Sequence, residues 1–358
     1  MTTPDILSLV AELAKKKREI EVDKITTDHG KLVEKKKIQN ELSSLTLNNI
    51  EKDRDVLKII AELERDNILI KQSIPFISPR LGEVVPLVAG SVTLMGAISG
   101  TGKSSNSAAI AHRNFTLKKK TLIISNEEPA KQILARIACI DGGVNYNSYN
   151  GGLCSKEERK IVAKKIVEVS PFVTIVADHM ISTVAEKIMK MLEEANETDE
   201  YTVAVIDFFQ RITSSSILPK DTMPYEVLIK FKNLITDYAS SAKLPVILMS
   251  QLMPMDPEEQ NRNVESRIKG CKAIYEAAST VIEAIKLEDL PITQYHVYKS
   301  RFGGLKRHWV PHEYINGLFM PISKSRMEFL KDKLKMEKRE AKLEELTAKY
   351  EDQDNGHS

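Results

Sequence analysis

A short run of glycine, lysine and serine near residue 100 has the residue types and spacing needed to hold a phosphate group. It reads AISGTGKS from Ala97 to Ser104, with an apolar run before it and helix-forming residues after it. Glycines let main-chain N–H groups turn toward an anion, and a helix N-terminus adds positive potential. Lys103 can reach the β- and γ-phosphates of ATP, and the Ser104 hydroxyl can bind Mg²⁺. The predicted ATP-binding residues are Ala97, Ser99, Gly100, Thr101, Gly102, Lys103, Ser104 and Ser105.

Acidic residues end two further apolar runs and could complete such a site. Asp207 ends the run 202–207, where a carboxylate can hold Mg²⁺, and Glu127 and Glu128 follow the run 121–125. A glutamate in that place can orient and deprotonate the water that attacks the γ-phosphate. The ends of parallel strands line the ligand crevice in sheets of this class, so we expect these groups near the phosphate loop. Spacing does not decide between Glu127 and Glu128.

Two more polar positions follow apolar runs closer to the C-terminus. Gln251 ends the run 245–251, and its neutral amide could contact the γ-phosphate and report its loss. Lys299 and Arg301 are separated by one residue, so on extended chain both point to the same side. They could reach into a neighbour's nucleotide site as an arginine finger. An exposed basic hairpin is the alternative interpretation.

The elements that must position these residues form an alternating pattern from about residue 80 onward. Short apolar runs separated by helical segments favour an α/β fold with a mostly parallel sheet covered on both faces. Thr183 and Glu186 predict a capping box at the start of one helix. Strands are expected at 92–95, 121–125, 172–177, 202–207, 246–250, 281–285 and 295–298, and helices at 103–117, 129–140, 156–168, 183–195 and 224–242.

Residues 1–72 have a different composition, with as many acidic as basic residues and no Phe, Trp or Tyr. They predict charged helices with too little apolar surface to form a core of their own. Pro75 and Pro79 mark a linker at 73–82. The α/β domain is then expected over 83–322, followed by a charged tail at 323–358 that is helical or disordered.

Charge and cysteine content exclude several classes of protein. The net charge is only +2, so any nucleic-acid binding must come from a local group of cations rather than from a globally basic surface. The three cysteines have no metal-ligand spacing and suggest neither a disulfide framework nor a zinc site. The N-terminus lacks the apolar region of a signal peptide, and the longest uncharged stretch contains four glycines, which argues against a membrane span. A cytoplasmic location is therefore expected, the host cytoplasm if a phage encodes the chain.

Together these segments resemble the RecA-like ATPases in order and spacing, and among them the motor domain of DnaB-type replicative helicases. The resemblance covers about residues 76–320 and rests on the segments MGAISGTGKSS, SNEEP, VIDFFQRI, PVILMSQL and KSRFGG. It implies a RecA-like P-loop ATPase fold, with Glu127 as the catalytic glutamate and Lys299 and Arg301 acting in trans. Segment 265–270 resembles the family's DNA-binding loop, which implies that Arg267, Lys269 and Gly270 contact single-stranded DNA.

Three departures separate this chain from the family pattern. The Pro-Thr-Gly that follows the finger is missing, the acidic cluster after the DNA loop is reduced to Glu276, and residues 1–72 replace the usual globular N-terminal domain. A short form of this kind looks like a phage or plasmid member.

The resemblance implies an ATP-driven hexameric ring that moves 5′ to 3′ on single-stranded DNA and unwinds a fork. Cations of the segments after Asp207 and Gln251 would face the centre of that ring: Arg211, Lys220, Arg262, Arg267 and Lys269. Primase, a helicase loader and a single-strand binding protein are the implied partners. Two alternatives share the ATP-site residues, namely a RecA-like recombinase or recombination mediator and a nucleotide-gated loader or adaptor. A closed ring, a filament and a monomer would distinguish the three.

Overall fold

The computed structural model describes residues 76–178, 183–198, 201–212, 224–241, 244–254, 264–268, 272–287, 289–302 and 308–355. The chain divides into two compact units, residues 1–68 and 69–358, and every described residue belongs to the second. The helices predicted within residues 1–72 therefore lie outside the described residues.

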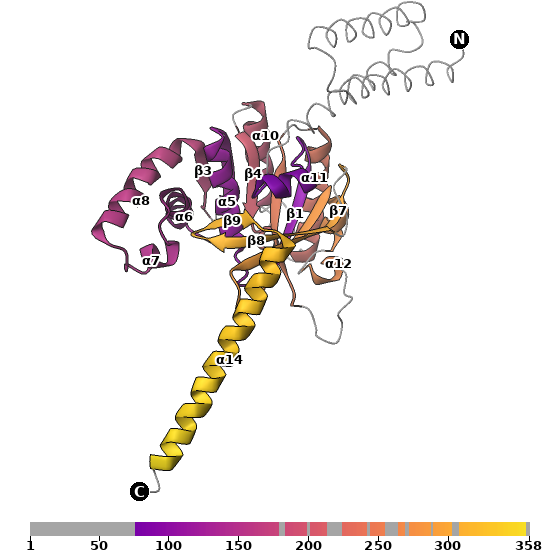
Figure 1. The fold of residues 1–358 in the computed structure, drawn as a ribbon. Helices are drawn as coiled ribbons and strands as arrows, with labels where there is room; N and C mark the ends of the chain where they lie inside the picture. The colour runs from indigo at the N-terminus through magenta and orange to yellow at the C-terminus, as the bar shows by residue number, and fades with distance from the viewer. Residues whose placement is uncertain are drawn as a thin grey trace, which may run out of the picture. The chain divides into compact units, whose positions relative to one another are not determined.

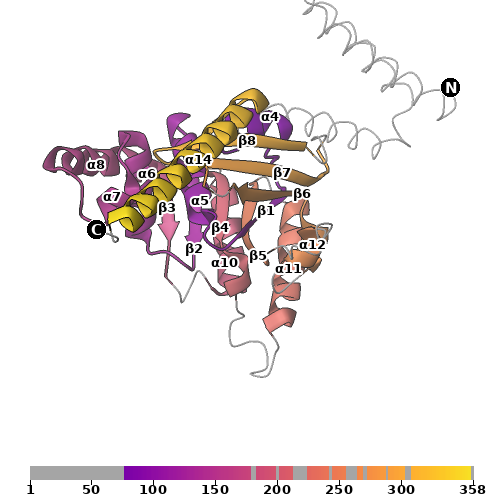
Figure 2. The same ribbon diagram turned by 60° about the horizontal axis from the view of Figure 1, so that its bottom comes forward.

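A nine-stranded sheet forms the centre of the second unit, with the strand order β3-β2-β4-β5-β1-β6-β7-β8-β9 (Figures 1 and 2). The six strands from β3 to β6 in this order pair in parallel, and β7, β8 and β9 continue the sheet with antiparallel pairing. This arrangement confirms the expected α/β class. The strands are β1 Val92–Ile98, β2 Lys120–Ser125, β3 Val173–Val176, β4 Tyr201–Asp207, β5 Val246–Leu252, β6 Thr280–Lys286, β7 Ile292–Ser300, β8 His308–Ile315 and β9 Leu318–Pro321.

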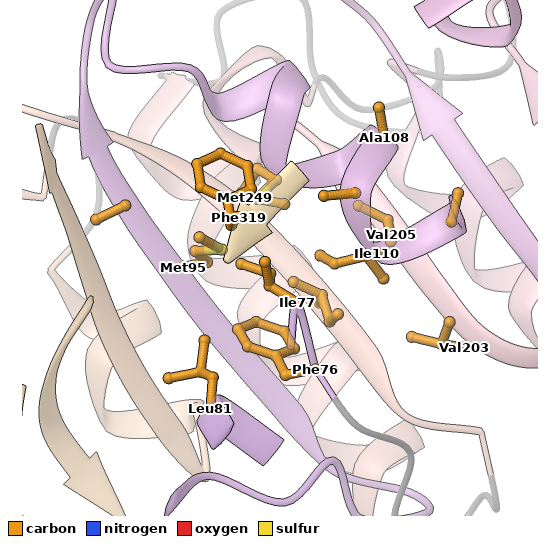
Figure 3. Packing of buried hydrophobic residues seen from close by; sticks show 14 of the residues in the cluster. Phe76, Ile77, Leu81, Met95, Ala108, Ile110, Val203, Val205, Met249 and Phe319 are labelled. Atoms are coloured by element: carbon orange, nitrogen blue, oxygen red, sulfur yellow. The ribbon is translucent and has the colours of Figure 1, made fainter. Parts of the chain in front are cut away.

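Apolar side chains cover both faces of the parallel strands, which is why these strands appear in the sequence as nearly continuous apolar runs. On one face, Met95, Val205 and Met249 pack with residues of α5 and with Phe76, and Figure 3 shows this cluster. On the other face, Leu94 packs with α10 and α11. The helices are α4 Pro79–Val84, α5 Lys103–Thr116, α6 Ala130–Gly142, α7 Tyr146–Asn150, α8 Lys156–Val169, α10 Ala185–Glu197, α11 Pro224–Ser241, α12 Val264–Arg267, α13 Ala273–Ala277 and α14 Lys324–Asn355, with 3-10 helices η1 Ser170–Phe172 and η2 Phe209–Arg211.

The seven predicted strands and five predicted helices are all present, with ends shifted by a few residues. Strands β8 and β9 are absent from the sequence-based prediction. The predicted capping box at Thr183 is wrong, because α10 begins after Val184 and has no side-chain cap. A capping box instead starts α8, where Ser155 and Glu158 each bond the other's main chain.

Helix α14 begins against the antiparallel end of the sheet. Met327 is buried and accepts a hydrogen bond from Gln294 of β7, and Lys324 lies 5.0 Å from the centre of the Trp309 ring on β8. The rest of this long helix extends past β8 and β9 (Figure 1). Within the described part of the chain, no helix is long and apolar enough to cross a membrane.

Candidate nucleotide-binding site

The glycine-rich loop joins the end of β1 to the start of α5 in a conformation that requires glycine at two positions. Gly100 and Gly102 have φ angles of +80° and +91°, and Gly102 is the N-terminal cap of α5. Side chains are strained in this left-handed region, whereas glycine is not. The loop is braced by Thr101, whose hydroxyl donates to the carbonyl of Ile98 at 2.6 Å, and by Asn106, whose amide donates to the carbonyl of Gly102 at 2.9 Å. The free N–H groups at the start of α5 are thereby held at the end of the sheet, where an anion can bind them.

Asp207 lies at the end of β4 with its carboxylate facing α5. Ser107 of α5 donates a hydrogen bond to one carboxylate oxygen at 3.0 Å, while the other oxygen is buried and has no partner among the described residues. Burial raises the pKa of Asp207 to about 6, with Glu127 and Glu128 contributing and Ser107 and Lys103 opposing the shift. An unpartnered buried carboxylate oxygen suits a bound cation. The site therefore fits Mg²⁺, with Ser104 in the first turn of α5 as the second predicted ligand.

The raised pKa of Asp207 gives a test of this environment in the metal-free protein. The folded chain holds this proton more tightly than the unfolded chain, so the stability that it contributes is complete below about pH 4 and is lost as the pH rises through about 6. We expect Asp207→Asn to raise the free energy of unfolding by about 1–3 kcal/mol at pH 8, and the gain to vanish near pH 4. Urea unfolding in EDTA at the two pH values measures this difference.

Asp141 provides the matched control for that experiment. Burial raises the pKa of its carboxyl group, but hydrogen bonds from Lys165 and His112 outweigh burial and lower it overall. Asp141→Asn should therefore destabilise the protein at pH 8. Equal effects of the two substitutions would contradict the assigned environment of Asp207.

The two glutamates that follow β2 have different surroundings. Glu128 forms a two-pronged ion pair with Arg136 of α6, with nitrogen–oxygen distances of 2.9 and 3.0 Å. The Arg136 guanidinium also lies 4.1 Å from the centre of the Tyr146 ring. Glu127 is exposed and forms no hydrogen bond or ion pair with another described residue. Of the two carboxylates, Glu127 is thus the one without an ion-pair partner among the described residues, and its role as the catalytic glutamate stays a prediction.

Two amide side chains near the carboxylates were missed by the sequence-based prediction. Asn126 pairs with the main chain of Phe208, and Gln210 pairs with the main chain of Gln251. They join the end of β2 to that of β4, and the end of β4 to that of β5. Their polarity beside buried strand ends is a signal in the sequence, but spacing does not reveal their partners.

A cavity of about 590 Å³ opens beside the phosphate loop. Its other walls come from Arg136 of α6, from the turn between β6 and β7, and from β8 and β9. This volume lies within the usual range of small-molecule sites. The sequence-based prediction missed the cavity because it missed β8 and β9. The lining residues are Gly100, Thr101, Gly102, Ser105, Arg136, Asn147, Lys286, Asp289, Leu290, Pro291, Ile292, Thr293, Tyr314 and Phe319.

Lys299 and Arg301 lie at the opposite edge of the sheet from the phosphate loop of the same chain. The N–H of Arg301 donates to the carbonyl of Ser279, and the N–H of Ser279 donates to the carbonyl of Val92, the first residue of β1. The phosphate loop follows Ile98, the last residue of β1. Seven residues of strand span roughly 20 Å, so these cations do not reach the phosphate loop of their own chain.

Both cations are held by the C-terminal end of helix α13. Lys299 donates to the carbonyls of Tyr275 and Glu276 at 2.9 and 3.0 Å, and Arg301 donates to that of Glu276 at 3.1 Å. Burial, together with the charge of Arg301, lowers the pKa of Lys299. Gln251, in contrast, is paired in register with Ala97 on β1 and lies at the phosphate-loop edge.

A family model described as the DnaB-like helicase C terminal domain matches residues 84–305, more than half of the chain. The chain belongs to this family. A solved structure described as an "ATPase Domain" aligns with a TM-score of 0.64 and 15% identity, over 77% of this chain and 100% of that chain. Another, described as "The Structure Of A DnaB-Like Replicative Helicase And Its Interactions With Primase", aligns with a TM-score of 0.63 and 15% identity, over 88% of this chain and 76% of that chain. At such identities the likeness shows the fold alone. No curated protein matches the sequence.

One residue of the DNA loop that was predicted from the DnaB resemblance is buried. The Arg267 side chain is 1% exposed and lies 2.7 Å from the Glu283 carboxylate, which is also 1% exposed, and it donates to the carbonyl of Met253 at 3.1 Å. Tyr298 donates a further hydrogen bond to Glu283 at 2.9 Å. Moving the guanidinium to a DNA strand would leave the Glu283 charge buried without its partner, at a cost of several kcal/mol.

This burial argues against a contact between Arg267 and the DNA backbone. Arg267 instead holds α12 against the sheet. Lys269 and Gly270, the other residues of the predicted DNA loop, lie outside the described residues. So do most of the other predicted channel cations, Lys220 and Arg262. Arg211 is exposed, and its guanidinium donates to the main-chain carbonyl of Asn126 at 3.0 Å.

Proposed function

We propose that this DnaB-like chain is the ATP-hydrolysing subunit of a ring-shaped replicative DNA helicase. It moves along single-stranded DNA, in the 5′ to 3′ direction that the family implies, and unwinds duplex DNA at a fork. The observation that carries the proposal is that the residues proposed for one ATP site lie at the two opposite ends of the parallel strands. The phosphate loop, Asp207 and Glu127 meet at one edge, while Lys299 and Arg301 lie at the other.

Each group of the proposed ATP site has a separate task. The N–H groups at the start of α5 and the Lys103 ammonium bind the phosphates, and the cavity beside the loop holds the base and ribose. Ser104 and Asp207 would hold Mg²⁺, which would supply positive charge beside the phosphates. Glu127 orients the attacking water and accepts its proton, and the Gln251 amide contacts the γ-phosphate. In this proposal the described residues of one chain supply the groups that bind the phosphates and orient the water, and a cation from another chain neutralises charge in the transition state.

A second copy of the chain supplies that cation through Arg301, with Lys299 beside it. A contact that joins one edge of a subunit to the opposite edge of the next is heterologous, and such contacts close into a ring when the rotation allows it. We propose a hexamer, with single-stranded DNA in its centre. A primase, a helicase loader and a single-strand binding protein are proposed as partners in the cytoplasm.

The test is unwinding of a forked DNA with single-stranded tails, with ATP consumption measured in the same reaction. Unwinding that requires the 5′ tail supports the proposal and its direction. ATP hydrolysis that DNA stimulates without unwinding would favour a recombinase, which forms filaments on DNA. Hydrolysis that DNA does not change would favour a loader or adaptor. Light scattering and electron microscopy of the same sample separate a closed ring from a filament and a monomer.

A further inference from the structure

The ends of β2, β4 and β5 carry three of the proposed active-site groups, and hydrogen-bonded ladders alone do not fix their relative positions. The ladder between β2 and β4 ends at Ser125 and Asp207, so Glu127 lies beyond it. The ladder between β4 and β5 ends at Ile206 and Leu248, so Gln251 also lies beyond it. Another set of contacts must therefore position Glu127 and Gln251 relative to Asp207.

Asn126 makes that connection between β2 and β4. The residue is 1% exposed, and its amide oxygen accepts a hydrogen bond from the Phe208 N–H at 3.0 Å. Its amide nitrogen donates to the Phe208 carbonyl at 2.9 Å, and its main-chain N–H donates to the Asp207 carbonyl at the same distance. Three hydrogen bonds thus join Asn126, which precedes Glu127, to Asp207 and Phe208.

Gln210 makes the equivalent connection between β4 and β5. Its amide nitrogen donates to the Gln251 carbonyl at 2.9 Å and to the Ser250 hydroxyl at 2.8 Å. Its amide oxygen accepts from the Gln251 N–H at 3.2 Å. Both amides therefore act as an extra strand residue would, because each pairs its C=O and N–H with those of one neighbouring residue.

We infer that Asn126 and Gln210 are positioning residues for ATP hydrolysis, which hold Glu127, Asp207 and Gln251 in one fixed arrangement. The inference rests on the proposed ATPase function. The phosphate loop is braced by a separate set of bonds, from Thr101 to Ile98 and from Asn106 to Gly102. Loss of either positioning amide therefore leaves the phosphate loop in place and displaces Glu127, Asp207 or Gln251, the groups proposed to act on the water, Mg²⁺ and the γ-phosphate. A displacement of about 1 Å at a reacting centre lowers the rate on the order of 100-fold.

The experiment compares Asn126→Leu and Gln210→Met with Asn114→Leu as a matched control. Asn114 is also fully buried, and its amide donates to the Ile110 carbonyl near the far end of α5. For each full-length variant, kcat and KM for ATP are measured with single-stranded DNA present, together with the Kd of a fluorescent ADP and the melting temperature. We expect kcat to fall about 10- to 100-fold for the two positioning variants, with KM and Kd within about threefold of wild type. The control should melt earlier and keep its kcat within about twofold.

The variant that carries both Asn126→Leu and Gln210→Met adds a second test, because independent losses of stability would not make the two effects on kcat depend on each other. If both amides hold one arrangement, its loss of kcat should be smaller than the product of the two single losses. A kcat within about twofold of wild type in both single variants, or an equal loss of nucleotide affinity, would overturn the inference. If Asn126→Leu does not fold, Gln210→Met, whose side chain is less buried, carries the same test. A wild-type chain that hydrolyses no ATP would instead overturn the proposed function on which the inference rests.

Discussion

Glu127→Gln should lower kcat for ATP hydrolysis by about 10²–10⁴ and leave the affinity for nucleotide within a few-fold of wild type. Glutamine keeps the size of the side chain and one acceptor oxygen, but it cannot accept the proton of the attacking water. The phosphate loop and Lys103, which are proposed to bind the phosphates, are not altered. The loss should therefore appear in the chemical step rather than in binding.

Glu128→Gln is the matched control, because the two glutamates are neighbours in the same turn. Glu128 is engaged by Arg136 through both carboxylate oxygens. Its substitution should weaken that ion pair and lower the melting temperature, while kcat falls less than about tenfold. Steady-state ATPase assays and fluorescent ADP binding on both variants measure the contrast. If Glu128→Gln abolished ATP hydrolysis and Glu127→Gln did not, the assignment of the catalytic base would be reversed.

Arg301→Ala should lower kcat by about 10³–10⁵, again with nucleotide affinity nearly unchanged, because a finger of this kind acts in the transition state. The position of Arg301 beside the start of β1 also predicts which chain it can act on. Since the phosphate loop of the same chain follows the far end of that strand, Arg301 can act as a finger only if it serves another subunit.

Mixing two inactive variants tests this directly. In rings that contain both Arg301→Ala and Glu127→Gln subunits, some interfaces combine an intact phosphate-loop edge from the first with an intact finger from the second. ATP hydrolysis should then return to a sizeable fraction of wild type after subunit exchange. A mixture of Glu127→Gln with Lys103→Ala is the negative control, because both changes affect the same edge. No recovery in the first mixture, despite demonstrated exchange, would show that Arg301 does not act in trans.

The parallel strands and their helices could be predicted from the sequence because burial on both faces produces apolar runs that polar segments interrupt. The phosphate loop could be predicted because its glycines and lysine are adjacent in sequence. Strands β8 and β9 could not, since β8 contains Pro311 and its residues, HWVPHEYI, form neither a continuous apolar run nor a regular alternation.

The prediction of the site was incomplete where a side chain contacts a residue that is far away in the sequence. Arg267 in its segment resembles a residue that contacts DNA, and only the fold brings it against Glu283 on β6. The pairing of Asn126 with Phe208 joins residues 82 positions apart, and no local spacing indicates it. What the sequence leaves open is therefore which buried polar groups meet one another.

The placement of the phosphate loop and Arg301 at opposite ends of β1 has a consequence for how activity depends on the amount of protein. If each working site combines edges of two chains, its population follows an association equilibrium rather than the number of folded chains. Dilution below the dissociation constant of the ring then removes turnover even when every chain is folded and saturated with ATP. Under the proposed function, the specific activity of the protein would therefore measure how much of it is assembled.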